Sequence, residues 1–93
     1  MAEYELMYII DSDVDGEKSE ELAARFKSAV ASEGGEVIDL KEWGKRRLAY
    51  EIKDKTEGRY MLMTFRGDVR VTRELERVLK ITDEVLRYIV IRK

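Results

Sequence analysis

Three consecutive cations, Lys45, Arg46 and Arg47, are the residues of this sequence best suited to binding a ligand. Arg presents a planar fork of N–H donors that can grip a phosphate through two hydrogen bonds, and Lys adds a point of positive charge. Each phosphate that such groups neutralise releases counterions, so affinity for a nucleic acid falls as the salt concentration rises. The chemistry that this stretch predicts is therefore the binding of a polyanion.

The stretch from Gly44 to Lys53 is predicted to be one strand, because apolar and polar residues alternate after the cations. Arg46 is expected on the same face as the apolar residues of this strand, and Lys45 and Arg47 on the opposite face. A strand that is charged in this way belongs at the edge of a sheet, where its polar side chains reach water or a partner.

Catalytic chemistry has little support in the sequence. There is no His and no Cys, so the serines lack a general base, thiolate metal sites are excluded, and no Gly-rich phosphate loop occurs. The Asp-rich segment 11–16 imitates the start of a calcium-binding loop, but its twelfth position, which requires Glu, is Leu22. We interpret this segment as a turn with an Asp N-cap, and we predict no enzyme, no cofactor and no metal site.

Length and composition predict a single soluble domain over residues 1–93, with 44% hydrophobic and 41% charged residues. No apolar run approaches the length of a membrane span and no signal-peptide core is present, so the cytoplasm is the expected compartment. Pro, Asn and Gln are absent together with His and Cys. We hypothesise a simplified or reconstructed sequence, the alternative being a natural protein of biased composition.

Charge is unevenly distributed along the chain, although the net charge is only −2. Residues 1–42 hold 4 basic and 12 acidic residues, whereas residues 43–93 hold 14 basic and 8 acidic residues. A mildly acidic total therefore does not argue against a polyanionic partner, because a local cationic surface is sufficient for binding.

The pattern of apolar residues predicts four strands, at 4–10, 36–53, 59–66 and 84–92, and two helices, at 17–33 and about 68–80. Gly34-Gly35 is expected to end the first helix in a left-handed conformation, Gly44 to bend the second strand, and Asp68 to cap the second helix. Residues 53–58 are expected to form a polar hairpin loop, with Gly58 at positive φ. The second helix carries an apolar stripe formed by Val71, Leu75, Val78 and Leu79.

The element order β-α-β-β-α-β predicts an α+β ferredoxin-like two-layer sandwich with a four-stranded antiparallel sheet. The first and third strands are apolar on both faces and are expected in the centre, and both helices are expected on one face. The residues predicted to point towards the helices are Leu6, Tyr8, Met61, Phe65, Tyr88 and Val90.

The other face of the sheet is predicted to be open and largely apolar, with Glu5 and Arg87 among the apolar residues. Exposed apolar surface of this extent indicates a partner-binding surface, although ordinary strand hydrophobicity is the alternative. The predicted partner-binding residues are Met7, Ile9, Trp43, Tyr60, Leu62, Ile89 and Ile91. Cations on the last strand, Arg87, Arg92 and Lys93, are further candidates for RNA binding. Tyr4 and Tyr60 are candidates for stacking on unpaired bases.

The run from Gly44 to Ile52 resembles the signature strand of the family of the bacterial small-subunit ribosomal protein numbered six: a glycine, basic residues and then Leu-Ala-Tyr-x-Ile. Tyr4-Glu5 and the closing Ile-Val-Ile-Arg-Lys are also similar, so the resemblance covers nearly all 93 residues. Glu51 departs from the family, which often has proline there, and so does the Asp-rich segment, which replaces a loop that often contains Asn and Pro.

The resemblance implies a structural component of the small ribosomal subunit that binds the central domain of 16S rRNA on cytoplasmic ribosomes, together with ribosomal protein eighteen. It implies that Lys45, Arg46 and Arg47 contact RNA or a partner, and that Leu48, Tyr50 and Ile52 are structural. The alternative function is a small-molecule-sensing domain of the same topology that dimerises through its sheet. Binding of a metabolite independently of salt, without affinity for RNA, would distinguish this alternative.

Overall fold

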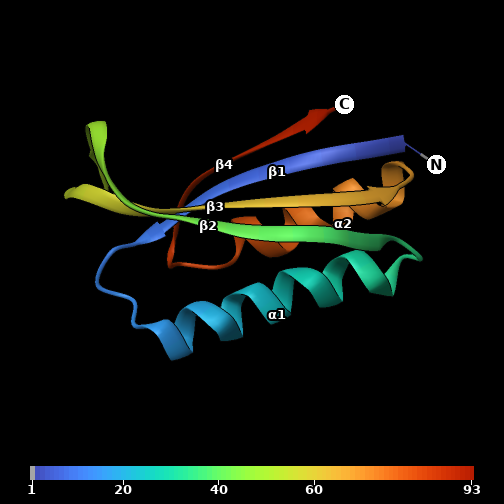
Figure 1. Ribbon diagram of the computed structural model, residues 1–93, viewed down its shortest axis with the longest axis horizontal. Coiled ribbons are helices and arrows are strands. Elements are labelled where there is room, and N and C mark those ends of the chain that lie inside the picture. Colours follow the sequence, from blue (N-terminus) through green and yellow to red (C-terminus); the bar gives the residue numbers. More distant parts are fainter. Residues whose placement is uncertain (1) are drawn as a thin grey trace.

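The computed structural model describes residues 2–93 and has the predicted element order (Figure 1). The strands are β1 (Ala2–Asp11), β2 (Glu36–Ile52), β3 (Lys55–Gly67) and β4 (Val85–Arg92), and the helices are α1 (Gly16–Ser32) and α2 (Val69–Lys80). The strand order in the sheet is β2-β3-β1-β4 and every neighbouring pair is antiparallel. This confirms the ferredoxin-like sandwich, with the doubly apolar strands in its centre.

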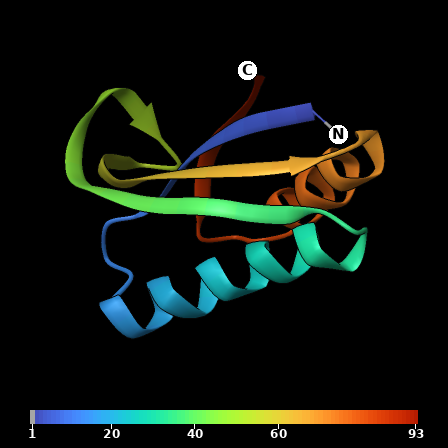
Figure 2. The ribbon, with the colours of Figure 1, turned by 45° about the vertical axis from the view of Figure 1, so that its right-hand side comes forward.

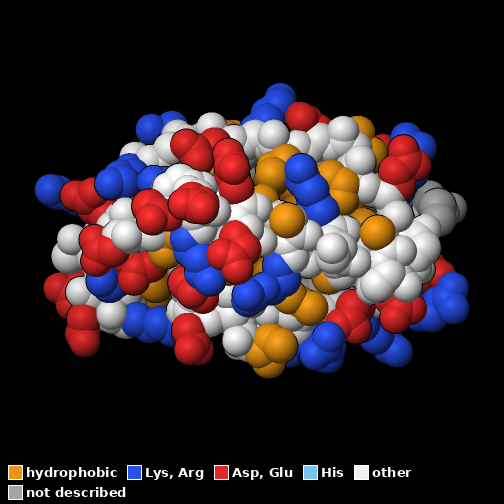
Figure 3. All heavy atoms as spheres, turned by 90° about the horizontal axis from the view of Figure 1, so that it is seen from below, with side chains coloured by type: hydrophobic (Ala, Val, Ile, Leu, Met, Phe, Trp, Pro, Cys, Tyr) orange, Lys and Arg blue, Asp and Glu red, His pale blue; other side chains and the backbone are white. Residues whose placement is uncertain are grey.

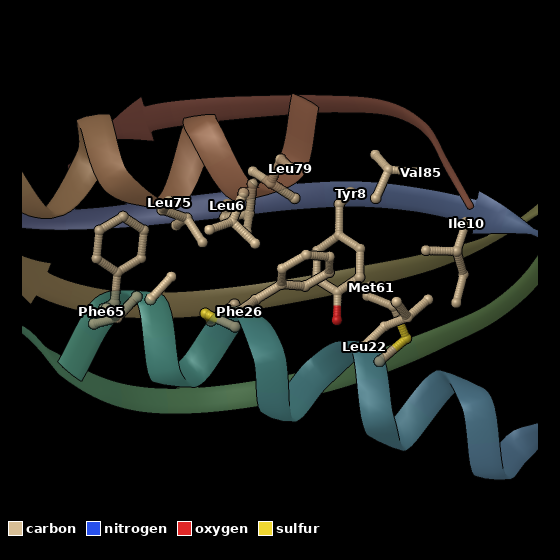
Figure 4. Close-up of a cluster of buried hydrophobic side chains, with 14 of the residues drawn as sticks. Leu6, Tyr8, Ile10, Leu22, Phe26, Met61, Phe65, Leu75, Leu79 and Val85 are labelled. Atoms are coloured by element: carbon tan, nitrogen blue, oxygen red, sulfur yellow. The ribbon is translucent and has the colours of Figure 1, made fainter. Parts of the chain in front are cut away.

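Both helices cover the same face of the sheet, and the opposite face is free of helices (Figure 2). All six residues predicted to point towards the helices either belong to the buried core or pack against it. Figure 4 shows that this core is built from β1, β3, both helices and Val85 at the start of β4. The Tyr8 and Phe26 rings pack edge to face, with their centroids 4.9 Å apart. Neither helix within residues 2–93 is both long and apolar enough to cross a membrane.

The predicted helix boundaries are set by the expected capping residues. Asp15 is the N-cap of α1 and its carboxylate accepts a hydrogen bond from the Lys18 N–H at 2.8 Å. Asp68 is the N-cap of α2 and accepts from the Arg70 N–H at 2.9 Å. Gly34 adopts φ 82° just after α1, a conformation that glycine reaches without a Cβ clash.

The prediction for residues 53–58 was wrong in one respect. The turn of the β2–β3 hairpin consists of Lys53 and Asp54, which adopt φ 51° and 65°, and Gly58 lies inside β3. Positive φ at both central residues is the requirement of the tight hairpin turn that follows the twist of the strands. Gly58 has a different role: a Cβ at this position would lie 2.3 Å from Cγ2 of Ile9.

Strand β2 is irregular, as an edge strand often is. Its register with β3 shifts at three places: between Val37 and Asp39, between Glu42 and Gly44, and after Arg47. Gly44 adopts φ 85° at the second shift, which confirms the predicted bend. Bulges interrupt the row of free backbone groups and so protect an edge from pairing with another chain.

Tyr8 gives the first test of this core. Its hydroxyl is buried without a hydrogen-bond partner among residues 2–93, and burial raises its pKa. We expect Tyr8→Phe to increase the free energy of unfolding by about 1 kcal/mol, because the cost of desolvating the hydroxyl disappears. The measurement is chemical denaturation at neutral pH, and a loss of stability in Tyr8→Phe would contradict this account.

We also expect Tyr8→Phe to change how the free energy of unfolding depends on pH. The pKa of Tyr8 is higher in the folded state than in the unfolded chain. The unfolded chain therefore releases the hydroxyl proton first, and the parent protein loses stability as the pH rises above the ordinary tyrosine value of 10.0. The difference in stability between Tyr8→Phe and the parent protein should therefore grow above this pH.

Gly58→Ala tests the close approach of β3 to β1. We expect this substitution to lower the free energy of unfolding by roughly 1–3 kcal/mol, because the added methyl group overlaps the Ile9 side chain. Gly16→Ala is the matched control, since a Cβ at Gly16 meets no atom within 4 Å and alanine favours the helix. Equal stability of the two variants would show that the contact with Ile9 is not a constraint.

Candidate nucleic-acid and partner interface

The cations of β2 divide between the two faces of the sheet, as the alternation predicts. Arg46 pairs with Gly58 and faces the open side, whereas Lys45 and Arg47 pair with Arg59 and Glu57 on the other side. All three of these predicted RNA-binding side chains are exposed. This strand therefore presents positive charge in two directions from one end of the sheet.

The cations of β4 are also exposed, and they too divide between the faces. Arg87 pairs with Ile9 on the open side, whereas Arg92 pairs with Tyr4. Lys93 is partly neutralised, because its Nζ lies 3.4 Å from a carboxylate oxygen of Glu3.

The two groups of cations lie mostly at opposite ends of the sheet. Lys45 lies beside Arg59, which pairs with Ile10 of β1, whereas Arg92 pairs with Tyr4. Six residues of extended strand separate these two levels, which corresponds to roughly 20 Å. Arg87 differs from the other β4 cations, because its partner Ile9 places it near the hairpin end.

The end of the β2–β3 hairpin curls away from the helices and over the open face (Figures 1 and 2). Two polar contacts fasten it to β4. The Tyr50 hydroxyl accepts a hydrogen bond from Nη1 of Arg87, and Lys53 Nζ lies 3.5 and 3.4 Å from the carbonyl oxygens of Asp83 and Val85. Arg87 therefore joins the cations of β2 at one end of the molecule.

Tyr50 and Lys53 were not predicted as site residues. Tyr50 was interpreted as structural, and its partner Arg87 is 37 residues away in the sequence. Nothing in the local pattern of either strand indicates this contact, because it depends on the curl of the hairpin in three dimensions.

The open face carries the predicted apolar residues in adjoining pairs: Met7 beside Leu62 and Ile89, and Glu5 beside Ile91. Ile89 and Ile91 are about half exposed. A shallow hollow of about 230 Å³ lies towards the hairpin end of this face. It is lined by Met7, Ile9, Tyr60, Arg87, Tyr88 and Ile89.

Two of the predicted site residues are placed differently from the expectation. Tyr4 lies on the helix side, half-buried and stacked on Phe65 with ring centroids 5.4 Å apart, so it cannot share a base-stacking surface with Tyr60 on the open side. Ile9 does lie on the open side but only 8% of it is exposed, because it packs close to Gly58 under the curled hairpin. It leaves little surface for a partner.

Trp43 is the extra residue at the bulge between Glu42 and Gly44, and it is 45% exposed. Ile38 occupies the corresponding position at the preceding bulge and is also exposed. A bulge places a side chain outside the regular alternation, which explains why these two apolar side chains of β2 are exposed.

The Asp-rich segment is held by a lysine. Lys55 Nζ lies 3.4 Å from Asp11 and 2.8 Å from Asp13, and the hydrogen bond from Lys55 lowers the pKa of the Asp13 carboxyl. No group of three or more potential metal-ligating side chains occurs within residues 2–93. The ammonium group of Lys55 therefore neutralises Asp11 and Asp13, two carboxylates of the segment whose spacing resembles the start of a calcium-binding loop.

The helix side presents mixed charge. Figure 3 shows acidic and basic side chains interspersed over this side. Several of the cations there are paired with carboxylates, for example Arg70 with Asp68 and Arg77 with Glu74. This side is therefore a surface of mixed charge on which part of the positive charge is compensated.

Comparison with known proteins gives a consistent result over the whole chain. Residues 3–92 match the family described as Ribosomal protein S6. The chain is 52% identical over 92 residues to the small ribosomal subunit protein bS6 of Thermoanaerobacter pseudethanolicus. This match covers 99% of this chain and 97% of that protein. It is also 47% identical over 93 residues to the bS6 protein of Carboxydothermus hydrogenoformans, and this match covers 100% of this chain and 97% of that protein.

Structural similarity leads to the same family. The crystal structure of the 30S ribosomal protein S6 from Thermotoga maritima superposes with a TM-score of 0.92 at 34% identity, covering 99% of this chain and 87% of that one. All three of these relatives are named as ribosomal proteins of the small subunit. The fold, the signature strand and the full-length similarity agree, and the chain belongs to the ribosomal protein S6 family of the small ribosomal subunit.

Proposed function

We propose that this protein binds the central domain of 16S rRNA as a structural component of the small ribosomal subunit, together with ribosomal protein eighteen. The observation that carries the proposal is the match to a ribosomal protein family over residues 3–92. A ribosomal protein of this family is a structural and not an enzymatic component, and it belongs to ribosomes in the cytoplasm. The alternative of a metabolite-sensing domain has no support from the relatives described above.

The arrangement of charge supports RNA as the ligand. Lys45, Arg46 and Arg47 project to both sides of an exposed edge strand, and Arg87 lies on the open side near the hairpin. Exposed cations of this kind neutralise phosphates without reading the sequence of the bases, so they suit attachment to a folded RNA. Arg92 and Lys93 provide a second point of contact at the other end of the sheet.

The apolar open face supports a protein partner beside the RNA. Met7, Tyr60, Leu62, Ile89 and Ile91 offer a continuous surface on the side of the sheet that the helices leave uncovered. We assign this surface, with Trp43 at its β2 edge, to ribosomal protein eighteen. Two partners bound on adjoining surfaces would lie close enough to contact each other, and such a contact would make their binding cooperative.

The test is binding to a fragment of the 16S rRNA central domain, with and without ribosomal protein eighteen, at several salt concentrations. We expect binding that depends on the partner, weakens with salt and weakens further in the double variant Arg46→Ala, Arg47→Ala. Loss of two phosphate contacts should lower the slope of log affinity against log salt by about two.

The matched control is the double variant Arg25→Ala, Arg73→Ala, which removes the same charge from the exposed surfaces of the two helices. This control should bind the RNA nearly as the parent protein does. Equal losses in both double variants would show that net charge alone matters, and absence of binding by the folded parent protein would refute the proposed function.

We also propose that the sequence has been simplified, because five residue types are absent from a chain of 93 residues. The proposed RNA contacts use only Lys and Arg, so they do not require the missing types. A natural protein of similar sequence lacking the same five residue types would contradict this proposal.

A further inference from the structure

We infer that Tyr50 is a positioning residue for RNA binding: its hydroxyl orders Arg87 while leaving the charge of the guanidinium available to a phosphate of the RNA backbone. The inference rests on the proposed function. It gives a role in binding to Tyr50, which was predicted from the sequence to be structural. It begins from the hydrogen bond that Arg87 Nη1 donates to the Tyr50 hydroxyl across the open face.

The chemistry of the acceptor matters. Several other cations of this protein are held by carboxylates: Lys55 by Asp11 and Asp13, Arg70 by Asp68, Arg77 by Glu74, and Lys93 by Glu3. Among residues 2–93, Arg87 is the one arginine whose guanidinium donates a hydrogen bond to a neutral side chain. A phenol hydroxyl fixes a guanidinium without cancelling its charge, so the field that attracts a phosphate remains.

The geometry leaves most of the guanidinium free. An arginine has five N–H donors, and the hydrogen bond to Tyr50 uses one of them. Arg87 remains exposed, so the other N–H groups can form the two-point contact that phosphate favours. An arginine that is already ordered also loses less side-chain entropy when it binds.

The rest of the hairpin contact holds Tyr50 in place. Leu48, two residues before Tyr50, is buried close to Gly58, and Lys53 reaches the carbonyl oxygens of Asp83 and Val85 at the start of β4. Tyr50 therefore lies between two anchored points of the hairpin. Its own side chain is 59% exposed, so its hydroxyl contributes little to the core.

The test is a double-mutant cycle of Tyr50→Phe and Arg87→Ala, with binding to the 16S rRNA central-domain fragment measured in the presence of ribosomal protein eighteen. We expect Tyr50→Phe to weaken binding roughly two- to tenfold, which is the value of a neutral hydrogen bond. Arg87→Ala should weaken it roughly tenfold or more, since a charged contact is lost. In the Arg87→Ala background, Tyr50→Phe should have no further effect.

Salt dependence separates positioning from charge. Arg87→Ala should lower the slope of log affinity against log salt by about one, whereas Tyr50→Phe, which keeps every charge, should leave the slope unchanged. Thermal unfolding of each variant verifies that the fold is intact. Tyr50→Phe combined with Arg73→Ala is the control pair, and its two effects should be additive because Arg73 lies on α2.

Three outcomes would overturn the inference. In the first, Tyr50→Phe binds as tightly as the parent protein. In the second, its effect is the same whether or not Arg87 is present, which would assign to Tyr50 a direct contact or a structural role. In the third, the parent protein does not bind the RNA, and the proposed function fails with it; this result is distinguishable because it appears before any substitution is made.

Discussion

The curl of the β2–β3 hairpin over the open face depends on a close contact in which Ile9, Leu48 and the bare backbone of Gly58 come together. Ile9 and Leu48 are each only 8% exposed, although they lie on the side of the sheet that no helix covers. A methyl group at Gly58 would overlap Ile9 and touch Leu48, so this close packing under the hairpin favours a residue without a side chain. The contacts of Tyr50 and Lys53 with β4 both depend on that fold-back.

The fold-back changes the distance between the cations of the two edge strands. In a flat sheet, cations on the two edge strands would be separated by the two central strands, at about 4.8 Å per strand spacing. The curled hairpin instead brings an edge strand to Arg87 and links the two through a neutral hydrogen bond. Elsewhere, Arg70 and Arg77 of α2 are paired with carboxylates. Lys45, Arg46 and Arg47, together with Arg87, therefore place exposed positive charge at the hairpin end of the sheet.

The two faces of the sheet have different roles. The helix face supplies stability through a dense core around Tyr8, Phe26 and Phe65, all of which are fully buried. The open face keeps Met7, Leu62, Ile89 and Ile91 accessible beside exposed cations, an arrangement suited to contacts with protein and RNA together. The bulges of β2 protect the edge from pairing with a second sheet, so association is directed to side chains and not to the backbone.

The sequence by itself determined the topology and the faces, because both depend on local periodicity. The alternation of residues in β1 and β3 identified the central strands. An Asp of segment 11–16, Gly34-Gly35 and Asp68 marked the helix ends, because capping acts within one turn. The alternation also placed Tyr4 on the face of Leu6 and Tyr8, opposite Tyr60, so the base-stacking pair was excluded by periodicity itself. The tertiary structure alone decided where Gly58 belongs, that Ile9 is covered, and that Tyr50 meets Arg87. These features depend on register and on the curl of a hairpin. Contacts between residues distant in sequence set both, and those contacts leave no local pattern.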